Sequence, residues 1–369
     1  MKRITILLFV NMLLFIASVG AQTLPTKDAM NSFAKYSKLR DIKQLEAARK
    51  QIDNAYKTKS DSNAFKNNLI RSLVYASLAN ADSNRKYTYT KDPIEEALFS
   101  LDQVYRSKFA GDVQSEVTYI NGQLTRAYLY RANTSLKNRR YLEALKYFTL
   151  LDSIENNNNF PIMHNLALLY QELGYNEKST IYYERLIDKQ PNPEYFMALA
   201  NLYELLGDEK NTIKILRNGS ELYPGSRDLI FKLINILVNK NDYKEIIKFT
   251  KQALKLDESN INLNYLTGFS YEMTGDNVKA EEYYKAILNI NPNNYEGNYA
   301  LGLLYLNLYL QSTNQTSLMY VSKYYLSKAN EIDPHELKTL ASLSILYKHI
   351  GDTDELQKIN NKINQLKLN

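Results

Sequence analysis

Residues 261–294 read INLNYLTGFSYEMTGDNVKAEEYYKAILNINPNN, and they set the pattern that most of the chain follows. Apolar and small side chains recur at helical spacing on both sides of a short turn, TGD at 274–276. Glycine suits the left-handed conformation that ends a helix, and aspartate is a common N-cap of the next one. Pro292 cannot continue a helix. The stretch therefore predicts two antiparallel helices, with Gly268 and Ala280 small where the helices approach closely.

The turn glycine and the closing proline both recur along the chain. The glycines are Gly174, Gly207, Gly275 and Gly351, separated by 33, 68 and 76 residues. The prolines are Pro191, Pro224, Pro292 and Pro334, separated by 33, 68 and 42 residues. Both series fit a repeat of about 34 residues with one insertion of about eight residues in the same unit. We expect this insertion to lengthen two helices or to form a protruding loop.

The units resemble the tetratricopeptide repeat (TPR) family. The first-helix pattern of a bulky residue, leucine, a small residue and tyrosine stands at Met163, Leu166, Ala167, Tyr170 and again at Phe196, Leu199, Ala200, Tyr203. The second-helix pattern stands at Ala280, Tyr284 and Pro292. The sequence departs from the pattern where Thr212, Ile246 and Leu356 replace the small residue of the second helix, and it contains no tryptophan. The resemblance implies an all-α fold, a right-handed α-solenoid of antiparallel helix pairs (a TPR superhelix).

The repeats cover about two-thirds of the chain. We assign residues 1–21 to a signal peptide and 22–124 to an N-terminal helical region with degenerate TPR-like helices. We assign 125–369 to about seven repeats, with an insertion near 309–320 and a capping helix at the C-terminus. Residues 22–36 are expected to be loosely ordered, with a short helix near residues 29–39. The repeats are expected to begin near Thr125, Phe160, Pro193, Arg227, Ile261, Tyr295 and Leu337.

The first 21 residues have the features of a secretory signal. Lys2 and Arg3 precede an apolar run at 4–17, and small residues at 19–21 offer a cleavage site. Cleavage and retention as a membrane anchor both stay open. We expect export to the periplasm or outer envelope of a bacterium, or release. The chain has no cysteine, which excludes disulfides and a lipidated cysteine at the junction.

Composition and motifs argue against an enzyme. The formal net charge of +6 is mild, and basic and acidic residues are mixed, so a nucleic-acid surface is not expected. His164, His335 and His349 do not pair at metal-binding spacing. No glycine-rich phosphate loop and no Gly-x-Ser-x-Gly motif is present. We therefore predict no catalytic residue, no cofactor and no metal.

Most of the 31 tyrosines fall in helix-packing positions of the repeat, Tyr324 among them. Tyr87, Tyr89 and Tyr309 lie outside those positions. They leave a second hypothesis open, a glycan-binding or glycan-processing accessory protein of the envelope.

The resemblance also implies where a partner would bind. In this family the fifth and ninth positions of the first helices face a concave groove. The candidate groove residues on this basis are Asn133, His164, Met197, Asn201, Phe231, Asn235, Tyr265, Phe269 and Tyr299. None of the fifth positions is basic, so a clamp for a C-terminal carboxylate is not expected.

Two interpretations of the candidate groove residues stay open. They bind a peptide or helix through apolar anchors, or they pack between neighbouring first helices. The first interpretation predicts a non-enzymatic scaffold for protein or peptide partners. The sequence leaves open which partners these are, and it also leaves open the oligomeric state.

Overall fold

The structure is a computed structural model, and it describes residues 24–154, 158–312 and 315–368. The predicted signal peptide lies outside these residues. The described part of the chain contains nineteen α-helices, one short 3₁₀ helix and no strand, which confirms the all-α prediction. None of its helices is both long and apolar enough to cross a bilayer.

The chain divides into two compact units, residues 1–186 and 187–369. This boundary falls within a helix, and it differs from the predicted one at 124/125. The predicted domain bounds therefore stay an interpretation of the repeat pattern, and each unit is described by itself below.

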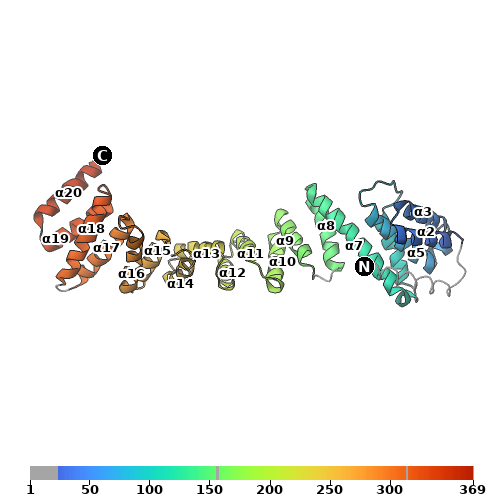
Figure 1. Cartoon of the computed structure of the whole chain (residues 1–369), viewed down its shortest axis with the longest axis horizontal. Coiled ribbons are helices and arrows are strands. Elements are labelled where there is room, and N and C mark those ends of the chain that lie inside the picture. The colour runs from blue at the N-terminus through green and yellow to red at the C-terminus, as the bar shows by residue number, and fades with distance from the viewer. Residues whose placement is uncertain (1–23, 155–157, 313–314, 369) are drawn as a thin grey trace. The chain divides into compact units, whose positions relative to one another are not determined.

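Unit 1 consists of helices that share one hydrophobic core. Figure 1 shows them in chain order: α2 (Leu24–Leu39), α3 (Ile42–Asn54), α4 (Lys59–Asn63), α5 (Phe65–Ala81), α6 (Pro93–Tyr105), the 3₁₀ helix η1 (Ala110–Val113), α7 (Gln114–Lys137), α8 (Tyr141–Ile154), α9 (Phe160–Glu172) and α10 (Asn176–Lys189), which crosses the unit boundary. The expectation that residues 22–36 are loosely ordered is wrong from Leu24 onward, whereas the short helix expected near residues 29–39 lies within α2. Met30, Phe33 and Tyr36 are buried in the core, and this burial holds α2 in place.

Helix α5 lies at the centre of unit 1 and contacts α2, α3, α4, α6 and α7. A helix surrounded in this way must satisfy its polar side chains internally. Arg71 of α5 forms ion pairs with Asp53 of α3 and Glu96 of α6. Its guanidinium carbon lies 4.5 Å from the ring centroid of Tyr56 and 4.6 Å from that of Tyr75. These contacts join three helices through one buried cation.

Unit 2 continues as pairs of antiparallel helices, each pair joined by a short turn. The helices are α11 (Pro193–Leu205), α12 (Glu209–Leu222), α13 (Arg227–Asn239), α14 (Tyr243–Leu254), α15 (Ile261–Met273), α16 (Asn277–Ile290), α17 (Tyr295–Gln311), α18 (Thr316–Ile332), α19 (Leu337–Ile350) and α20 (Thr353–Leu368). The first helix of each pair begins at the residue where the repeat spacing places a unit. Helices α17 and α18 have 17 residues each, whereas α15 has 13 and α16 has 14, so the insertion lengthens both helices of its pair.

The turns within the pairs require a residue in the left-handed conformation. The four predicted turn glycines adopt it, with φ between +73° and +87°. Asn241 (φ 55°) and Arg139 (φ 57°) take the same place in two turns that lack glycine. After the turn, Asp208, Asp242 and Asp276 each accept a hydrogen bond from a backbone N–H of the following helix. The turn chemistry predicted from TGD therefore also holds where the glycine is absent.

In the α15–α16 and α17–α18 pairs, the two helices approach closely at a glycine of the first helix. A Cβ atom on Gly268 would lie 2.7 Å from the Tyr284 ring and 3.3 Å from the carbonyl oxygen of Ala280. At Gly302 a Cβ atom would lie 2.7 Å from Leu326. The hydroxyl of Ser322 donates to the Gly302 carbonyl at 2.9 Å. The expectation that Gly268 and Ala280 are small because the helices cross there is confirmed.

Glu272 lies one turn beyond Gly268 and accepts a hydrogen bond from the Tyr284 hydroxyl at 2.9 Å. Burial raises the pKa of the Glu272 carboxyl above its usual value, and hydrogen bonds from Tyr284 and Asn307 oppose the shift only in part. A raised folded-state pKa means that ionised Glu272 destabilises the fold. The loss of folding stability is complete above the folded-state pKa, and it disappears as the pH falls below the unfolded-state pKa.

We expect Gly268→Ala to lower the urea midpoint of unfolding, because the methyl group overpacks the α15–α16 crossing by about 1–3 kcal/mol. Gly122→Ala is the matched control. Gly122 lies within α7 and a Cβ atom there meets no atom within 4 Å. Alanine should stabilise that helix by about 1 kcal/mol. Equal effects of the two changes would contradict the close crossing.

We expect Glu272→Gln to raise the urea midpoint at pH 7, because glutamine keeps an acceptor for Tyr284 and removes the buried charge. The advantage should shrink as the pH is lowered through the raised pKa of Glu272, where the wild-type carboxyl becomes neutral. Urea titrations of both proteins from neutral to acidic pH measure this. An advantage that does not change with pH would show that the charge is not the cause.

Candidate partner-binding surface

The fifth and ninth positions of the first helices are exposed or half-buried in all seven repeats. The fifth positions are Leu129, His164, Met197, Phe231, Tyr265, Tyr299 and Ala341, and the ninth positions are Asn133, Leu168, Asn201, Asn235, Phe269, Leu303 and Ile345. In contrast, the seventh and eighth positions are buried in every repeat from the one that begins at Phe160 to the one that begins at Tyr295. Within each first helix, the candidate residues therefore lie on a face that stays at least partly accessible, which we call the first-helix face.

Three aromatic candidates in unit 2 pack against other rings while keeping part of their surface exposed. The Tyr265 and Phe269 rings are parallel with centroids 6.4 Å apart. Tyr265 also packs against Tyr284 of α16 (5.9 Å), and Phe269 packs against Tyr243 of α14 (5.9 Å). These residues stabilise the contact with the second helices and also contribute to the first-helix face.

Tyr299 is held between α17 and α19, the first helices of two successive repeats. Its ring is parallel to that of Tyr295 at 6.0 Å, and the Lys338 ammonium from α19 lies 5.1 Å from both ring centroids. Lys338 was not among the candidates, because it stands at the second position of its repeat. The structure therefore adds one cation to this part of the face.

A hollow of about 320 Å³ lies between α11 and α13, the first helices of two successive repeats. Two of the predicted residues, Met197 and Asn201, line it together with Ala198 and Leu229. Carboxylates that the sequence reasoning missed, Glu194 and Asp228, also line it. We call this site the α11–α13 hollow.

The two exposed candidates on α13 lie outside the α11–α13 hollow. Phe231 is 37% exposed, and Asn235 is exposed. The side-chain oxygen of Asn201 accepts a hydrogen bond from Lys232 Nζ at 2.8 Å, and Lys232 also pairs with Glu204 at 2.6 Å. Asn201 therefore helps to join α11 to α13 as well as lining the hollow.

The remaining two candidates belong to unit 1. Asn133 is exposed on α7. The His164 ring lies edge-on to Tyr183 at 6.2 Å, and Tyr183 is almost fully buried. His164 therefore takes part in the packing between α9 and α10. The sequence signal for a binding role was its position in the repeat alone.

The tyrosines outside the candidate face serve mainly in packing. The same stack joins first and second helices in three units: Tyr170 with Tyr182, Tyr271 with Tyr283, and Tyr305 with Tyr325. Tyr324, expected in a packing position, is instead 63% exposed. Its neighbour Tyr325 takes the inward direction, since adjacent helical side chains point about 100° apart.

Two of the three scattered tyrosines are engaged inside the protein. Tyr89 donates to Asp82 at 2.7 Å, and Tyr309 packs edge-on against His349 at 5.2 Å. Tyr87 is half-buried.

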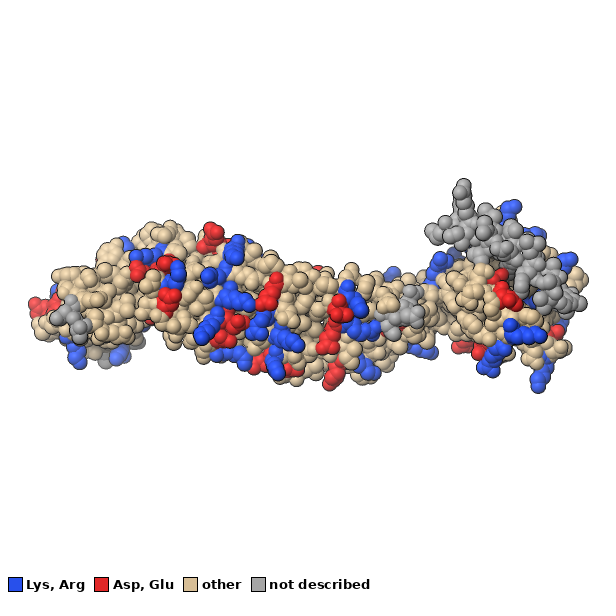
Figure 2. Space-filling view, turned by 90° about the horizontal axis from the view of Figure 1, so that it is seen from below, with Lys and Arg blue, Asp and Glu red and all other residues tan. Residues whose placement is uncertain are grey.

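Other functional chemistry finds little support in the described residues. They contain no group of three or more histidine, aspartate or glutamate side chains placed to hold a metal ion. On the face drawn in Figure 2, basic and acidic side chains are interleaved, without a wide area of one sign. Such a surface is unlike the continuous basic stripe that nucleic acids require.

Comparison with solved structures finds helical repeat proteins. One is the C-terminal part of a TPR repeat-containing protein from Cytophaga hutchinsonii, 18% identical, covering 65% of this chain and 95% of that one, with a TM-score of 0.42. Another is YrrB, described as a TPR protein with an unusual peptide-binding site, 16% identical, covering 53% of this chain and 97% of that one, with a TM-score of 0.34.

Among curated proteins, the chain is similar to anaphase-promoting complex subunit 3 of Schizosaccharomyces pombe. The two are 22% identical over 341 residues, which is 89% of this chain and 49% of the relative. The chain thus spans about half the length of that protein. Residues 160–193, which form α9, α10 and the first residue of α11, match the family model of the tetratricopeptide repeat. The family match therefore covers one tetratricopeptide repeat, at residues 160–193.

Proposed function

We propose that the protein is a non-enzymatic scaffold that binds a protein or peptide partner through the first-helix face of unit 2. The observation that carries this proposal is the α11–α13 hollow, where the predicted residues Met197 and Asn201 come together. The curated relative is by its name a subunit of a complex, which supports protein binding in general.

The hollow can hold one or two side chains of a partner. Met197, Ala198 and Leu229 offer an apolar lining, and burying apolar surface against them contributes about 25 cal/mol per Å². Glu194 and Asp228 form no ion pair within the described residues. A partner with an apolar side chain next to a lysine or arginine would satisfy both parts of the site. Phe231, exposed on α13, adds an aromatic anchor of the kind that dominates binding energy.

We further propose that the protein is exported to a bacterial cell envelope, in the periplasm or at the outer envelope, or is released. The support is the sequence of residues 1–21, with its basic start, apolar run and small-residue end.

A glycan-binding accessory is the second candidate function. One observation favours it: Tyr320 and Tyr324 are 64% and 63% exposed, one turn apart on α18. Two rings on one helix face can stack against sugars. A Tyr320→Ala/Tyr324→Ala variant tests this candidate separately, because neither residue belongs to the first-helix face.

We expect Met197→Ala/Phe231→Ala to weaken partner binding at least tenfold, since each change removes an apolar anchor worth about 1 kcal/mol or more. Helicity should not change, because both side chains are partly exposed. The matched control is Leu205→Ala/Val278→Ala, which removes apolar side chains exposed outside the fifth and ninth positions. Partners retained from an envelope extract by residues 22–369 are purified, and their affinities for the three proteins compared. Equal affinities would place the binding surface elsewhere.

We expect the mature protein to begin at Gln22 when it is isolated from the envelope of its own organism. N-terminal sequencing of the purified protein measures this. A mature chain that still begins at Met1 in a membrane fraction would show that the segment acts as an anchor, and Met1 in a cytoplasmic fraction would contradict export.

A further inference from the structure

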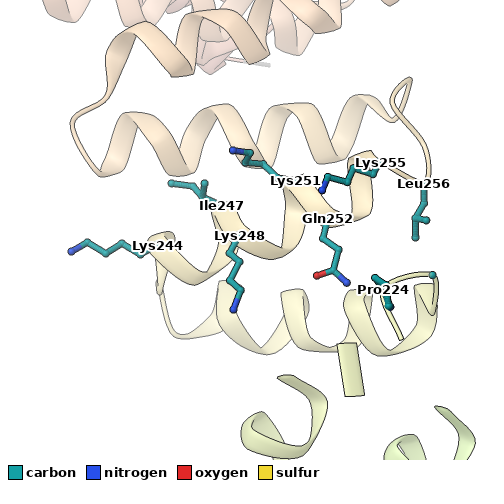
Figure 3. A pocket seen from close by; sticks show the side chains of 9 residues that line it. Pro224, Lys244, Ile247, Lys248, Lys251, Gln252, Lys255 and Leu256 are labelled. Carbon is teal, nitrogen blue, oxygen red and sulfur yellow. The ribbon is translucent and has the colours of Figure 1, made fainter. Parts of the chain in front are cut away.

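A second hollow lies on α14, the second helix of its pair, and it is basic. Lys244, Lys248, Lys251 and Lys255 follow one another at spacings of four, three and four residues, which places them along one flank of the helix. They line a hollow of about 670 Å³, together with Ile247, Gln252 and Leu256 and the turn at Pro224 and Gly225. Figure 3 shows the four lysines distributed along α14, with Gln252 and Pro224 at one side. We call this site the α14 hollow.

Most of the positive charge in the α14 hollow is not neutralised by the protein itself. Lys248 pairs with Glu221 of α12 at 2.6 Å. Lys244, Lys251 and Lys255 form no ion pair within the part of the chain that the structure describes. Lys251 and Lys255 lie at the C-terminal end of α14, where cations offset the helix dipole. That effect does not account for Lys244, which lies in the first turn.

The length of the row of lysines matches that of a short extended peptide. Lys255 lies eleven residues after Lys244, which corresponds to about 16 Å along a helix at 1.5 Å per residue. An extended chain covers this distance with about five residues. Ile247 and Leu256 provide apolar surface between the charges, and the Gln252 side chain is fixed by donating to the Ser220 carbonyl at 2.8 Å.

We propose that the α14 hollow binds a short acidic stretch of polypeptide in extended form. Its carboxylates contact Lys244, Lys251 and Lys255, and an apolar side chain lies on Ile247 and Leu256. Glu221 and Glu245 stand beside the lysines and disfavour a long polyanion such as a nucleic acid, which would have to pass over them. The site belongs to a second helix and shares no residue with the α11–α13 hollow, so it is an additional interaction site.

The test uses residues 22–369 and a fluorescently labelled peptide of sequence EELEEE, with binding followed by anisotropy. Saturable binding is expected at low salt. It should weaken steeply from about 0.05 M to about 0.5 M NaCl, because salt screens exposed charges. A peptide of sequence QQLQQQ should not bind measurably.

The variant Lys244→Gln/Lys251→Gln/Lys255→Gln should bind EELEEE about tenfold more weakly than wild type, as expected from the loss of three exposed charge pairs. Lys35→Gln/Lys50→Gln/Lys146→Gln removes the same charge from exposed helix positions of unit 1 and should bind within about twofold of wild type. Circular dichroism checks that both variants keep their helicity. The Met197→Ala/Phe231→Ala variant should bind EELEEE normally, so failure here and failure of the proposed function are distinguishable.

Any of these results with the peptides would overturn the proposal: no saturable binding of EELEEE at low salt, equal losses in the α14 variant and its control, or binding of QQLQQQ as tight as that of EELEEE. A labelled single-stranded oligonucleotide serves as the competing polyanion. If it binds more tightly than EELEEE and depends on the same lysines, the site recognises phosphates and an acidic polypeptide is the wrong ligand.

Discussion

In the pairs α9–α10, α15–α16 and α17–α18, the arrangement depends on the close approach between the eighth position of the first helix and the second helix. At Gly268 and Gly302 there is no room for a Cβ atom, and at Ala167 the carbonyl accepts a hydrogen bond from Ser179 of the facing helix at 2.8 Å. This contact fixes how the first helix is rotated about its axis. With the eighth position turned inward, the fifth and ninth positions flank it and keep part of their surface accessible. The accessible face is thus a geometrical consequence of the small residues at the crossing.

The sequence alone predicted this part of the fold well, because it depends on local chemistry. Glycines in left-handed turns, aspartate caps and closing prolines act over a few residues and can be recognised one at a time. Asn241 and Arg139 take the left-handed position without glycine, so the turns they form carry no comparable signal. The repeat period located them instead. Helix α2 has no such period, and its burial in the core of unit 1 shows that the helix begins already at Leu24.

The candidate sites depend on packing between elements, and there the sequence was less informative. It could place Tyr265, Phe269 and Tyr299 on the first-helix face, but it could not show that Tyr243, Tyr284 and Lys338 lie against them. It could not decide whether Tyr324 or Tyr325 points inward, because both residues suit the aromatic position. The four lysines of α14 are visible in the sequence at helical spacing, yet their significance depends on which of them find partners, and that requires the positions of α12 and α16.

The packing of the half-buried aromatic residues has a consequence for the proposed binding. A side chain that is already held by neighbouring rings loses little conformational freedom when a partner covers its remaining surface, and this lowers the entropic cost of association. Tyr265 and Tyr299 are held in this way, whereas Phe231 is more exposed. Removing Tyr265 or Tyr299 therefore affects stability and binding together, while Phe231 and Met197 report on binding with less effect on the fold. On the proposed function, packing orders the surface that a partner meets, so the packing and recognition interpretations of the first-helix face are compatible.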